Sequence, residues 1–220
     1  MQLHGAMKEV ETDDGVYRAK AVIIATGAGH KHLGLENEQN LVGRGIGYCA
    51  SCDGMFYRGK TVAVVGGGNS AAADALVLSR IAKKVHVIHR RDTLRATKVY
   101  HEPLMRAENV EFHWNSEVSQ LLADGKLTGV TLKDVHSGAE STLDLDGLFI
   151  SIGRDPATKL FADQLELDRS GYIVAGESTQ TSVPGVFAVG DVRTKAVRQI
   201  VTAAADGAVA AHYVEEYLKG

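Results

Sequence analysis

The feature that most constrains the fold of this chain is a glycine-rich loop between an apolar strand and a helix. Residues 60–65 (KTVAVV) form a nearly continuous apolar run, which is typical of a strand buried in a parallel sheet. The loop at residues 66–71 (GGGNSA) follows it, and apolar residues then recur at helical spacing as far as Ile81. This context fits the G-x-G-x-x-A fingerprint of a dinucleotide-binding unit.

Individual positions of the loop have separate physical roles. Gly66 permits the tight turn, Gly68 lets a pyrophosphate approach the backbone, and Ala71 allows the helix to pack closely on the strand. The helix that opens at Asn69 and Ser70 offers free N–H groups and its positive dipole end to phosphates. A simple tight turn is the alternative interpretation, but the flanking strand and helix favour a nucleotide site.

A basic cluster follows the next apolar strand, at residues 85–88. It consists of His89, Arg90 and Arg91, about 20 residues after the loop, where NAD enzymes place an acid for the ribose hydroxyls. Guanidinium groups at this position would instead bind a 2′-phosphate through charge-assisted hydrogen bonds. Arg95 adds a further contact if a helix begins there. A solvated basic turn is the alternative, and the placement at the strand end favours NADPH over NADH.

Strand and helix patterns alternate over most of the chain, which predicts an α/β fold. Between residues 110 and 145 the pattern changes to short alternating segments with turns at residues 124–125 (DG) and 137–138 (SG), which predicts antiparallel strands. Residues 95–107 are expected to form a helix. The other expected elements are strands at residues 17–26, 148–152 and 186–189 and a helix at residues 199–218.

This order of elements predicts one domain inserted into another. Residues 32–152 are expected to form a Rossmann-like dinucleotide-binding domain with a small antiparallel excursion. The flanking residues 1–31 and 153–220 are similar to each other in sequence pattern, and we expect them to be two portions of a second domain of the same type. The redox-type cysteine motif described next falls within the inserted domain.

The two cysteines of the chain, Cys49 and Cys52, form a C-x-x-C pair followed directly by Asp53. This spacing lets two thiols close a short disulfide ring, which exchanges with a protein disulfide through a mixed disulfide. Asp53 is placed to give or take the proton as a thiolate forms or leaves. Two alternatives stay open: a structural pair of buried thiols, and a zinc site completed by His30 and His32. The spacing is not that of a standard zinc finger, so we favour the redox pair and expect both histidines in an interdomain linker.

Composition narrows the remaining function classes. A net charge of −3 argues against nucleic acid as a partner, because phosphate binding requires a basic excess. Hydrophobic residues make up 45% of the chain and charged residues 23%, which is ordinary for a globular protein. We find no apolar run of about 18 residues and no basic-then-apolar leader, so no membrane span or secretory signal is expected. The cytoplasm is therefore the expected compartment, and no metal is expected.

Taken together, these motifs resemble the low-molecular-weight thioredoxin reductases of the pyridine nucleotide-disulfide oxidoreductase superfamily. Three of the segments that carry the resemblance are residues 49–54 (CASCDG), 66–71 (GGGNSA) and 89–95 (HRRDTLR). Residues 179–192 (TQTSVPGVFAVGDV) are similar to the family's segment ending in the flavin-contacting Gly-Asp. The pair Arg198-Gln199 and the turn at residues 25–27 (ATG) are also similar to flavin-site segments, so the resemblance covers essentially the whole chain.

The resemblance implies a route in which NADPH reduces FAD, FAD reduces the disulfide, and the dithiol reduces thioredoxin. It implies that Cys52 faces the flavin, that Cys49 attacks the partner protein, and that Asp53 is the acid/base. It also implies a homodimer, and a rotation of the inserted domain that lets the cysteines and the nucleotide face one flavin in turn. The residues expected to bind NADPH are Gly66, Gly68, Asn69, Ser70, Ala71, His89, Arg90, Arg91, Arg95, Ile152 and Gly153. The residues that the resemblance places at FAD are Thr26, Gly27, Gly190, Asp191, Val192, Arg198, Gln199 and Ile200.

The sequence departs from the family pattern at its N-terminus. Family members begin with a strand and a G-x-G-x-x-G loop for the FAD pyrophosphate, and nothing before Ala25 supplies one. The glycine-rich residues 43–47 (GRGIG) neither follow a strand nor open a helix, so we expect a linker there. We therefore expect these 220 residues to lack the N-terminal FAD-binding segment and, by themselves, to be flavin-poor and inactive. The alternatives are a non-catalytic NADPH-binding module and a related flavin reductase that serves a peroxidase system.

Overall fold

A computed structural model describes residues 1–220, the whole of the sequence. The chain folds into two compact units, one formed by residues 30–153 and the other by residues 1–29 together with residues 154–220. Strands of a parallel sheet alternate with helices, which confirms the predicted α/β class. None of the helices combines the length and the apolar character needed to cross a bilayer.

The unit of residues 30–153 is built on a five-stranded parallel sheet with the order β5-β12-β6-β7-β8. Almost every residue of the three central strands is buried, as expected for a parallel sheet that is covered on both faces. The predicted strand at residues 60–65 is confirmed as the centre of this sheet. The strands are β5 (Ile46–Gly47), β6 (Thr61–Val65), β7 (Lys84–Ile88), β8 (Val110–His113) and β12 (Gly147–Ile150).

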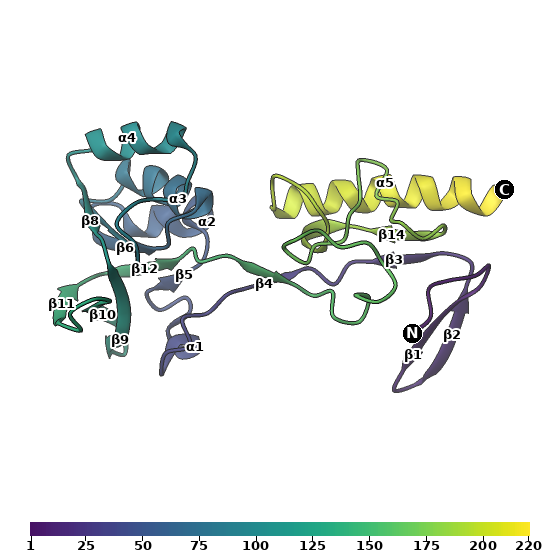
Figure 1. The fold of residues 1–220 in the computed structure, drawn as a ribbon, viewed down its shortest axis with the longest axis horizontal. Coiled ribbons are helices and arrows are strands. Elements are labelled where there is room, and N and C mark those ends of the chain that lie inside the picture. The colour runs from purple at the N-terminus through teal and green to yellow at the C-terminus, as the bar shows by residue number, and fades with distance from the viewer. The chain divides into compact units, whose positions relative to one another are not determined.

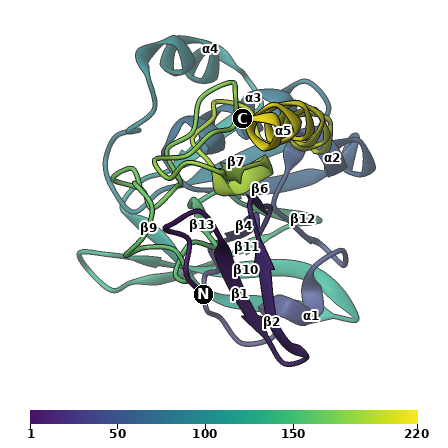
Figure 2. The ribbon, with the colours of Figure 1, turned by 90° about the vertical axis from the view of Figure 1, so that its right-hand side faces the viewer.

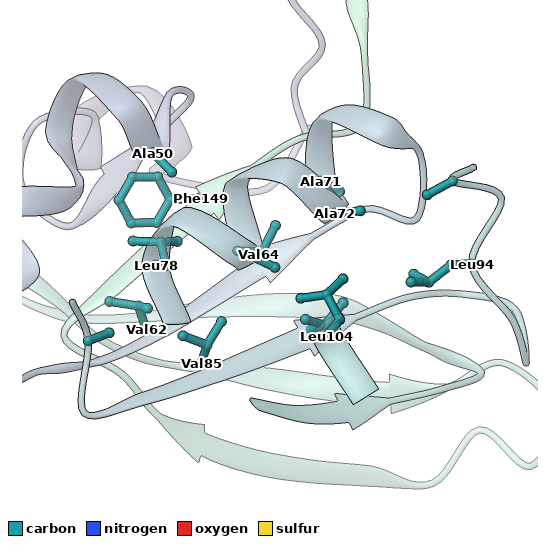
Figure 3. Packing of buried hydrophobic residues seen from close by; sticks show 14 residues of the cluster. Ala50, Val62, Val64, Ala71, Ala72, Leu78, Val85, Leu94, Leu104 and Phe149 are labelled. Carbon is teal, nitrogen blue, oxygen red and sulfur yellow. The ribbon is translucent and has the colours of Figure 1, made fainter. Parts of the chain in front are cut away.

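Helices cover one face of this sheet (Figure 3). The longest is α3 (Asn69–Ser79), which buries three alanines and Leu78 and can therefore approach the strands closely. A cluster of branched side chains from the strands fills the space beneath it, together with Leu104 and Phe149. The shorter helical elements of this unit are α1 (Glu38–Leu41), α2 (Ala50–Asp53), η1 (Gly54–Tyr57), η2 (Lys98–Tyr100) and α4 (His101–Arg106).

A small antiparallel sheet covers the other face, and its strands confirm the antiparallel pattern predicted for most of residues 110–145. It consists of β9 (Ser116–Asp124), β10 (Lys126–Asp134) and β11 (Glu140–Asp144) in the order β11-β10-β9. The predicted turns join its strands, and Gly125 and Gly138 adopt φ angles of +66° and +72° that favour glycine. Apolar side chains of β9 and β10, among them Val118 and Val130, pack with those of the parallel sheet.

The second unit combines a parallel strand pair, a hairpin and the C-terminal helix (Figure 1). β3 (Val22–Ile24) pairs in parallel with β14 (Val186–Ala188), and α5 lies along β14, where Phe187 and Val189 pack against Ala210. Figure 2 views α5 almost end-on. The remaining elements are β1 (Lys8–Thr12), β2 (Gly15–Ala19), β4 (Ala28–His30), β13 (Arg154–Pro156), η3 (Gly190–Val192) and α5 (Ile200–Lys219), with β1 paired to β2 and β4 to β13.

Four expectations about local structure were wrong. The single strand expected at residues 17–26 is divided, because β2 ends at Ala19 and β3 begins at Val22. Residues 43–47 are not only a linker, since Ile46 and Gly47 form edge strand β5, and residues 110–113 form the parallel strand β8 instead of an antiparallel one. Edge strands this short take their pairing from distant partners, so local pattern could not place them.

The fourth error concerns the helix expected at residues 95–107. Only residues 98–106 are helical, as η2 and α4. The backbone N–H groups of Arg95 and Ala96 donate to the carbonyl oxygen of Gly67 at 2.7 and 3.0 Å, so this stretch is tied to the glycine loop.

Candidate active site

The glycine loop has the backbone geometry that requires its residue types. Gly66 has a φ of +143°, and a Cβ there would collide with the carbonyl oxygen of Ser151 and with Ala71. A Cβ on Gly67 would collide with the imidazole of His89. Space above Gly68 is open, and no side chain caps the helix that starts after it. The open end of α3 is therefore accessible to an anionic ligand.

A cavity of about 510 Å³ opens beside this loop, within the unit of residues 30–153. Of the residues expected to bind NADPH, two do not line it: Ala71, which is buried under the loop, and the exposed Arg91. Lys31, Ser116 and Glu117 also line the cavity, and no sequence motif pointed to them. The predicted residues that the structure brings together on its wall are Gly66, Gly68, Asn69, Ser70, His89, Arg90, Arg95, Ile152 and Gly153.

The basic side chains at residues 89–95 include one that is buried and supports the glycine loop, and arginines that carry the positive charge. His89 is buried against Gly67 and lies edge-on to Trp114, and its Nε2 has no hydrogen-bond partner. Burial lowers the pKa of His89, and the nearby Arg95, Arg91 and Arg90 lower it further, so the imidazole is neutral at pH 7. The arginines therefore supply the positive charge, while His89 supports the loop. Asn69 braces the same region by accepting a hydrogen bond from the Thr97 N–H at 2.8 Å.

The redox pair lies in the same unit. Cys49 and Cys52 form a disulfide with an S–S distance of 2.06 Å, which agrees with the redox interpretation of the C-x-x-C motif. Cys49 is the N-cap of α2 and is half-buried, whereas Cys52 is exposed. The N–H groups of Cys52 and Asp53 both donate to the carbonyl oxygen of Cys49, which holds the ring in a helical turn. Cys52 is therefore the more exposed residue of the pair.

Asp53, the residue expected to exchange protons with the pair, follows Cys52 directly at the end of α2. The carboxylate is half-buried, and it lies against Gly47, where a Cβ would stand 3.6 Å from Oδ2. Burial raises the pKa of Tyr57, and the charges of Asp53 and Asp146 raise it further, so this phenol stays protonated. Asp74 is a second carboxylate near the pair that no sequence motif indicated, because its partners come from distant segments.

The two histidines considered as zinc ligands have other partners. His30 stacks on Tyr48 with ring centroids 4.5 Å apart, and His32 contacts the Tyr48 hydroxyl at 2.8 Å and Glu38 at 3.2 Å. Burial and the hydrogen bond to Glu38 raise the pKa of Tyr48 to about 12. Both cysteine sulfurs are engaged in the disulfide, so the structure gives the zinc alternative no support.

Comparison with known proteins identifies the family. A sequence model of the pyridine nucleotide-disulphide oxidoreductases matches residues 3–207. The chain is 47% identical to a thioredoxin reductase of Streptomyces clavuligerus over 99% of this chain and 68% of the relative. It is 45% identical to that of Listeria monocytogenes over 96% of this chain and 67% of the relative.

The chain belongs to the thioredoxin reductases of this family. Solved structures agree. The thioredoxin reductase of Streptococcus pyogenes superposes with a TM-score of 0.89 at 42% identity, over 98% of this chain and 71% of that one. The thioredoxin reductase from Giardia duodenalis superposes with a TM-score of 0.90 at 35% identity, over 100% of this chain and 73% of that one. The chain thus spans about two thirds of the length of the thioredoxin reductases it matches.

The residues that the thioredoxin reductase resemblance places at FAD all lie in the second unit. The Asp191 Oδ2 accepts a hydrogen bond from Arg154 at 2.7 Å, while its Oδ1 is buried without a partner. Arg198 lies over the ring of Tyr172, and its Nε is likewise buried and unpaired. Gln199 caps α5 through a capping box, and Ile200 is 90% exposed.

The remaining residues of this set have structural partners. The Thr26 hydroxyl donates to the carbonyl oxygen of Ala157, and Gly27 has a φ of +73°. Gly190 donates its N–H to Asp206, and Val192 is buried. Asp206 was missed by sequence reasoning, because an acid inside an amphipathic helix carries no local signal of what it binds.

Proposed function

We propose that the protein is a thioredoxin-disulfide reductase that passes electrons from NADPH through FAD to the Cys49–Cys52 disulfide and then to thioredoxin. The observation that carries the proposal is the redox disulfide held in the same unit as a glycine-loop cavity. The relatives named above, which are called thioredoxin reductases, support thioredoxin as the partner. In this proposal, residues 30–153 are the NADPH domain and the remaining residues belong to the FAD domain.

The cavity residues fit NADPH. The open space above Gly68 and the uncapped start of α3 can receive the pyrophosphate. Arg90 and Arg95 on the cavity wall can hold the 2′-phosphate, which NADH lacks. Lys31 adds a third cation to the wall, whereas Glu117 is an acid that a phosphate would avoid. The balance of charge favours NADPH over NADH.

The second unit offers partial support for FAD. The family uses a flavin, and FAD when bound would supply a two-electron relay between the nucleotide and the disulfide. The buried unpaired Oδ1 of Asp191 can accept a hydrogen bond from a cofactor hydroxyl, and the unpaired Nε of Arg198 can donate one. Arg154 holds Asp191 in place. These are the groups among residues 1–220 that we assign to the flavin.

The cysteines carry the exchange with the partner protein. Reduction of the disulfide adds two electrons and two protons and yields the two thiols. The Cys49 thiolate attacks the thioredoxin disulfide, and the thiolate released from thioredoxin takes up a proton. Cys52 then attacks the mixed disulfide, which restores the Cys49–Cys52 bond and releases reduced thioredoxin. Asp53, next to Cys52, accepts the proton of the attacking Cys52 thiol and gives it to the second thiolate that thioredoxin releases. We extend the proposal to a homodimer, as the resemblance implies, and to the cytoplasm as its compartment.

The test is NADPH-dependent reduction of a thioredoxin disulfide by a fusion in which the N-terminal FAD-binding segment of a relative precedes residues 1–220, because these residues by themselves are expected to be flavin-poor and inactive. We expect Cys49→Ser and Cys52→Ser each to abolish turnover while leaving the affinity for NADPH unchanged, because the cavity does not include these residues. Turnover that persists in either variant would refute the assignment. A fusion that binds NADPH but has no flavin absorption band would instead support the non-catalytic module. Faster reduction of a peroxidase-system disulfide than of thioredoxin would support the third alternative.

A further inference from the structure

Asp74 links the redox pair to the wall of the nucleotide cavity. It lies in the second turn of α3, within the unit of residues 30–153. Its Oδ1 accepts a hydrogen bond from the backbone N–H of Ala50 at 3.2 Å, and its Oδ2 accepts one from the Ser151 hydroxyl. One carboxylate therefore connects three elements: α2, α3 and the segment after β12.

The Ala50 end of this link is next to a reactive sulfur. Ala50 is the first residue of α2, and Cys49 is the N-cap before it. The Ala50 N–H is one of the first-turn donors for which the helix itself offers no acceptor. It belongs to the peptide that directly follows Cys49, so it would be available to a Cys49 thiolate if Asp74 did not occupy it. The Ala50 side chain is itself fixed, because it is buried in the cluster that includes Phe149 (Figure 3).

The Ser151 end of the link is part of the cavity. Ser151 follows β12 directly and lines the cavity beside the glycine loop. Its backbone N–H donates to Val65 at 2.8 Å, and its carbonyl oxygen lies where a Cβ on Gly66 would be. Ser151 is thus held by its N–H at the end of β6, next to the glycine loop, and by its hydroxyl at Asp74.

Two carboxylates lie close to the pair in the fold. Asp53 on α2 follows Cys52, and Asp74 on α3 holds the peptide after Cys49. The titratable group from η1 is Tyr57, which remains neutral because burial and neighbouring carboxylates raise its pKa. Reduction of the disulfide creates a thiolate that is repelled by Asp74 and competes with it for the Ala50 N–H. The charge of Asp74 therefore favours the oxidised pair.

We propose that Asp74 is a positioning residue that sets the redox equilibrium of the Cys49–Cys52 pair and, through Ser151, makes this equilibrium respond to a nucleotide in the cavity. The response to a nucleotide rests on the proposed function, whereas the effect on the pair rests only on the disulfide. Because coupling between two sites is reciprocal, reduction of the pair also changes the affinity of the cavity for its nucleotide.

The test measures the equilibrium between disulfide and dithiol in mixtures of reduced and oxidised dithiothreitol. Oxidation of dithiothreitol supplies the two electrons and two protons that the pair takes up. The four variants are Asp74→Asn, Asp74→Glu, Ser151→Ala and the control Asp124→Asn, an exposed acid of the same unit. Asp74→Asn keeps an oxygen that can accept from Ala50 but removes the charge, and Asp74→Glu restores the charge. Alkylation and mass measurement give the reduced fraction of each.

We expect Asp74→Asn to shift the equilibrium toward the dithiol about tenfold, which is equivalent to about 30 mV for two electrons. The shift should be seen at a pH above the ordinary thiol pKa of about 8.5, where the reduced pair carries a thiolate. Asp74→Glu should bring the equilibrium most of the way back to that of the unmodified protein, and the equilibrium of Asp124→Asn should stay within about twofold of it. In a Cys52→Ser background, Asp74→Asn should lower the pKa of the Cys49 thiol by about one unit, seen in the ultraviolet absorbance of the thiolate. An Asp74→Asn equilibrium within twofold of the unmodified protein would overturn the positioning role.

The nucleotide half is tested with 2′-phospho-ADP-ribose, which cannot exchange electrons. We expect it to shift the equilibrium of the unmodified protein about fivefold, and we expect Ser151→Ala to abolish that response while binding persists by calorimetry. Binding without any shift in the unmodified protein would overturn the coupling and leave the proposed function intact. Absence of binding would remove the nucleotide assignment and the coupling together. The Asp74→Asn result would still decide the effect on the pair.

Discussion

Replacement of Asp206 by alanine should destabilise the second unit more than any comparable change of a surface acid. Asp206 lies on α5 and is only 7% exposed. Its carboxylate accepts hydrogen bonds from the N–H of Gly190 at 2.8 Å, from Nε and Nη2 of Arg193 at 2.9 and 2.6 Å, and from Lys195 at 2.7 Å. It therefore joins the C-terminal helix to the turn that carries Asp191.

The size of the effect follows from burial and pairing. Burial raises the pKa of Asp206, but hydrogen bonds from Arg193, Lys195 and Gly190 outweigh it and lower the pKa from 3.8 to about 2. This depression corresponds to about 2 kcal/mol of stability at neutral pH. Asp206→Ala also leaves the guanidinium of Arg193, which is 8% exposed, without its anion. Breaking such a buried pair costs about 3–5 kcal/mol, so we expect Asp206→Ala to lower the free energy of unfolding of the second unit by an amount in that range.

The pH dependence has a definite sign. The pKa of Asp206 is lower in the folded protein, so the stability it contributes is present above pH 3.8 and is lost as the pH falls through about 2. Asp206→Asn keeps one acceptor oxygen and removes the charge. We expect the free energy of unfolding of Asp206→Asn to lie between those of the unmodified protein and Asp206→Ala. The variant should also lack the loss of stability that the unmodified protein shows as the pH falls.

Urea unfolding followed with two signals can separate the two units. The single tryptophan, Trp114, lies in the unit of residues 30–153, so its fluorescence reports that unit, whereas far-ultraviolet circular dichroism reports both. We expect Asp206→Ala to shift the dichroism transition and to leave the fluorescence transition in place. Glu215→Ala, which removes an exposed ion pair with Lys219 on the same helix, is the control and should cost less than about 0.5 kcal/mol. A loss below about 1 kcal/mol for Asp206→Ala would refute the reasoning.

Three further predictions concern the cavity and the cysteines. In calorimetry, Arg90→Ala and Arg95→Ala should each weaken the binding of NADPH by about 1.5–3 kcal/mol per charged hydrogen bond lost, and the binding of NADH should not change. Arg91 lies off the cavity wall, so Arg91→Ala should change the affinity for NADPH little. Gly67→Ala should cost about 1–3 kcal/mol in Trp114-monitored unfolding because its Cβ meets His89, and adding His89→Ala should recover part of that loss; no recovery would contradict the clash. Thiol titration should find both cysteines after reduction and almost none after oxidation, and stoichiometric zinc in fresh protein would contradict the redox assignment.

Sequence alone was sufficient where one contiguous segment holds all the information. Residues 62–65 are apolar throughout and short enough to indicate a buried strand, and the glycines after it allow a turn that side chains would block. Two cysteines three residues apart can reach each other without help from the rest of the fold, and the disulfide is present. The arginines after residues 85–88 were expected at the nucleotide site because the loop and the end of β7 belong to neighbouring parallel strands.

Tertiary structure decided every feature whose partners lie far apart in the chain. Strand β5 has two residues and takes its place in the sheet from β12, about 100 positions later, which no local pattern can specify. Arg95 lies outside any helix, and its N–H donates to the carbonyl oxygen of Gly67, 28 positions earlier in the chain. Asp74 binds a peptide 24 positions before it and a hydroxyl 77 positions after it, and Asp206 binds Gly190 and Arg193 from the preceding turn. Composition and spacing determine which groups a chain possesses, but the role of a carboxylate depends on which donors the folded backbone brings within hydrogen-bond distance.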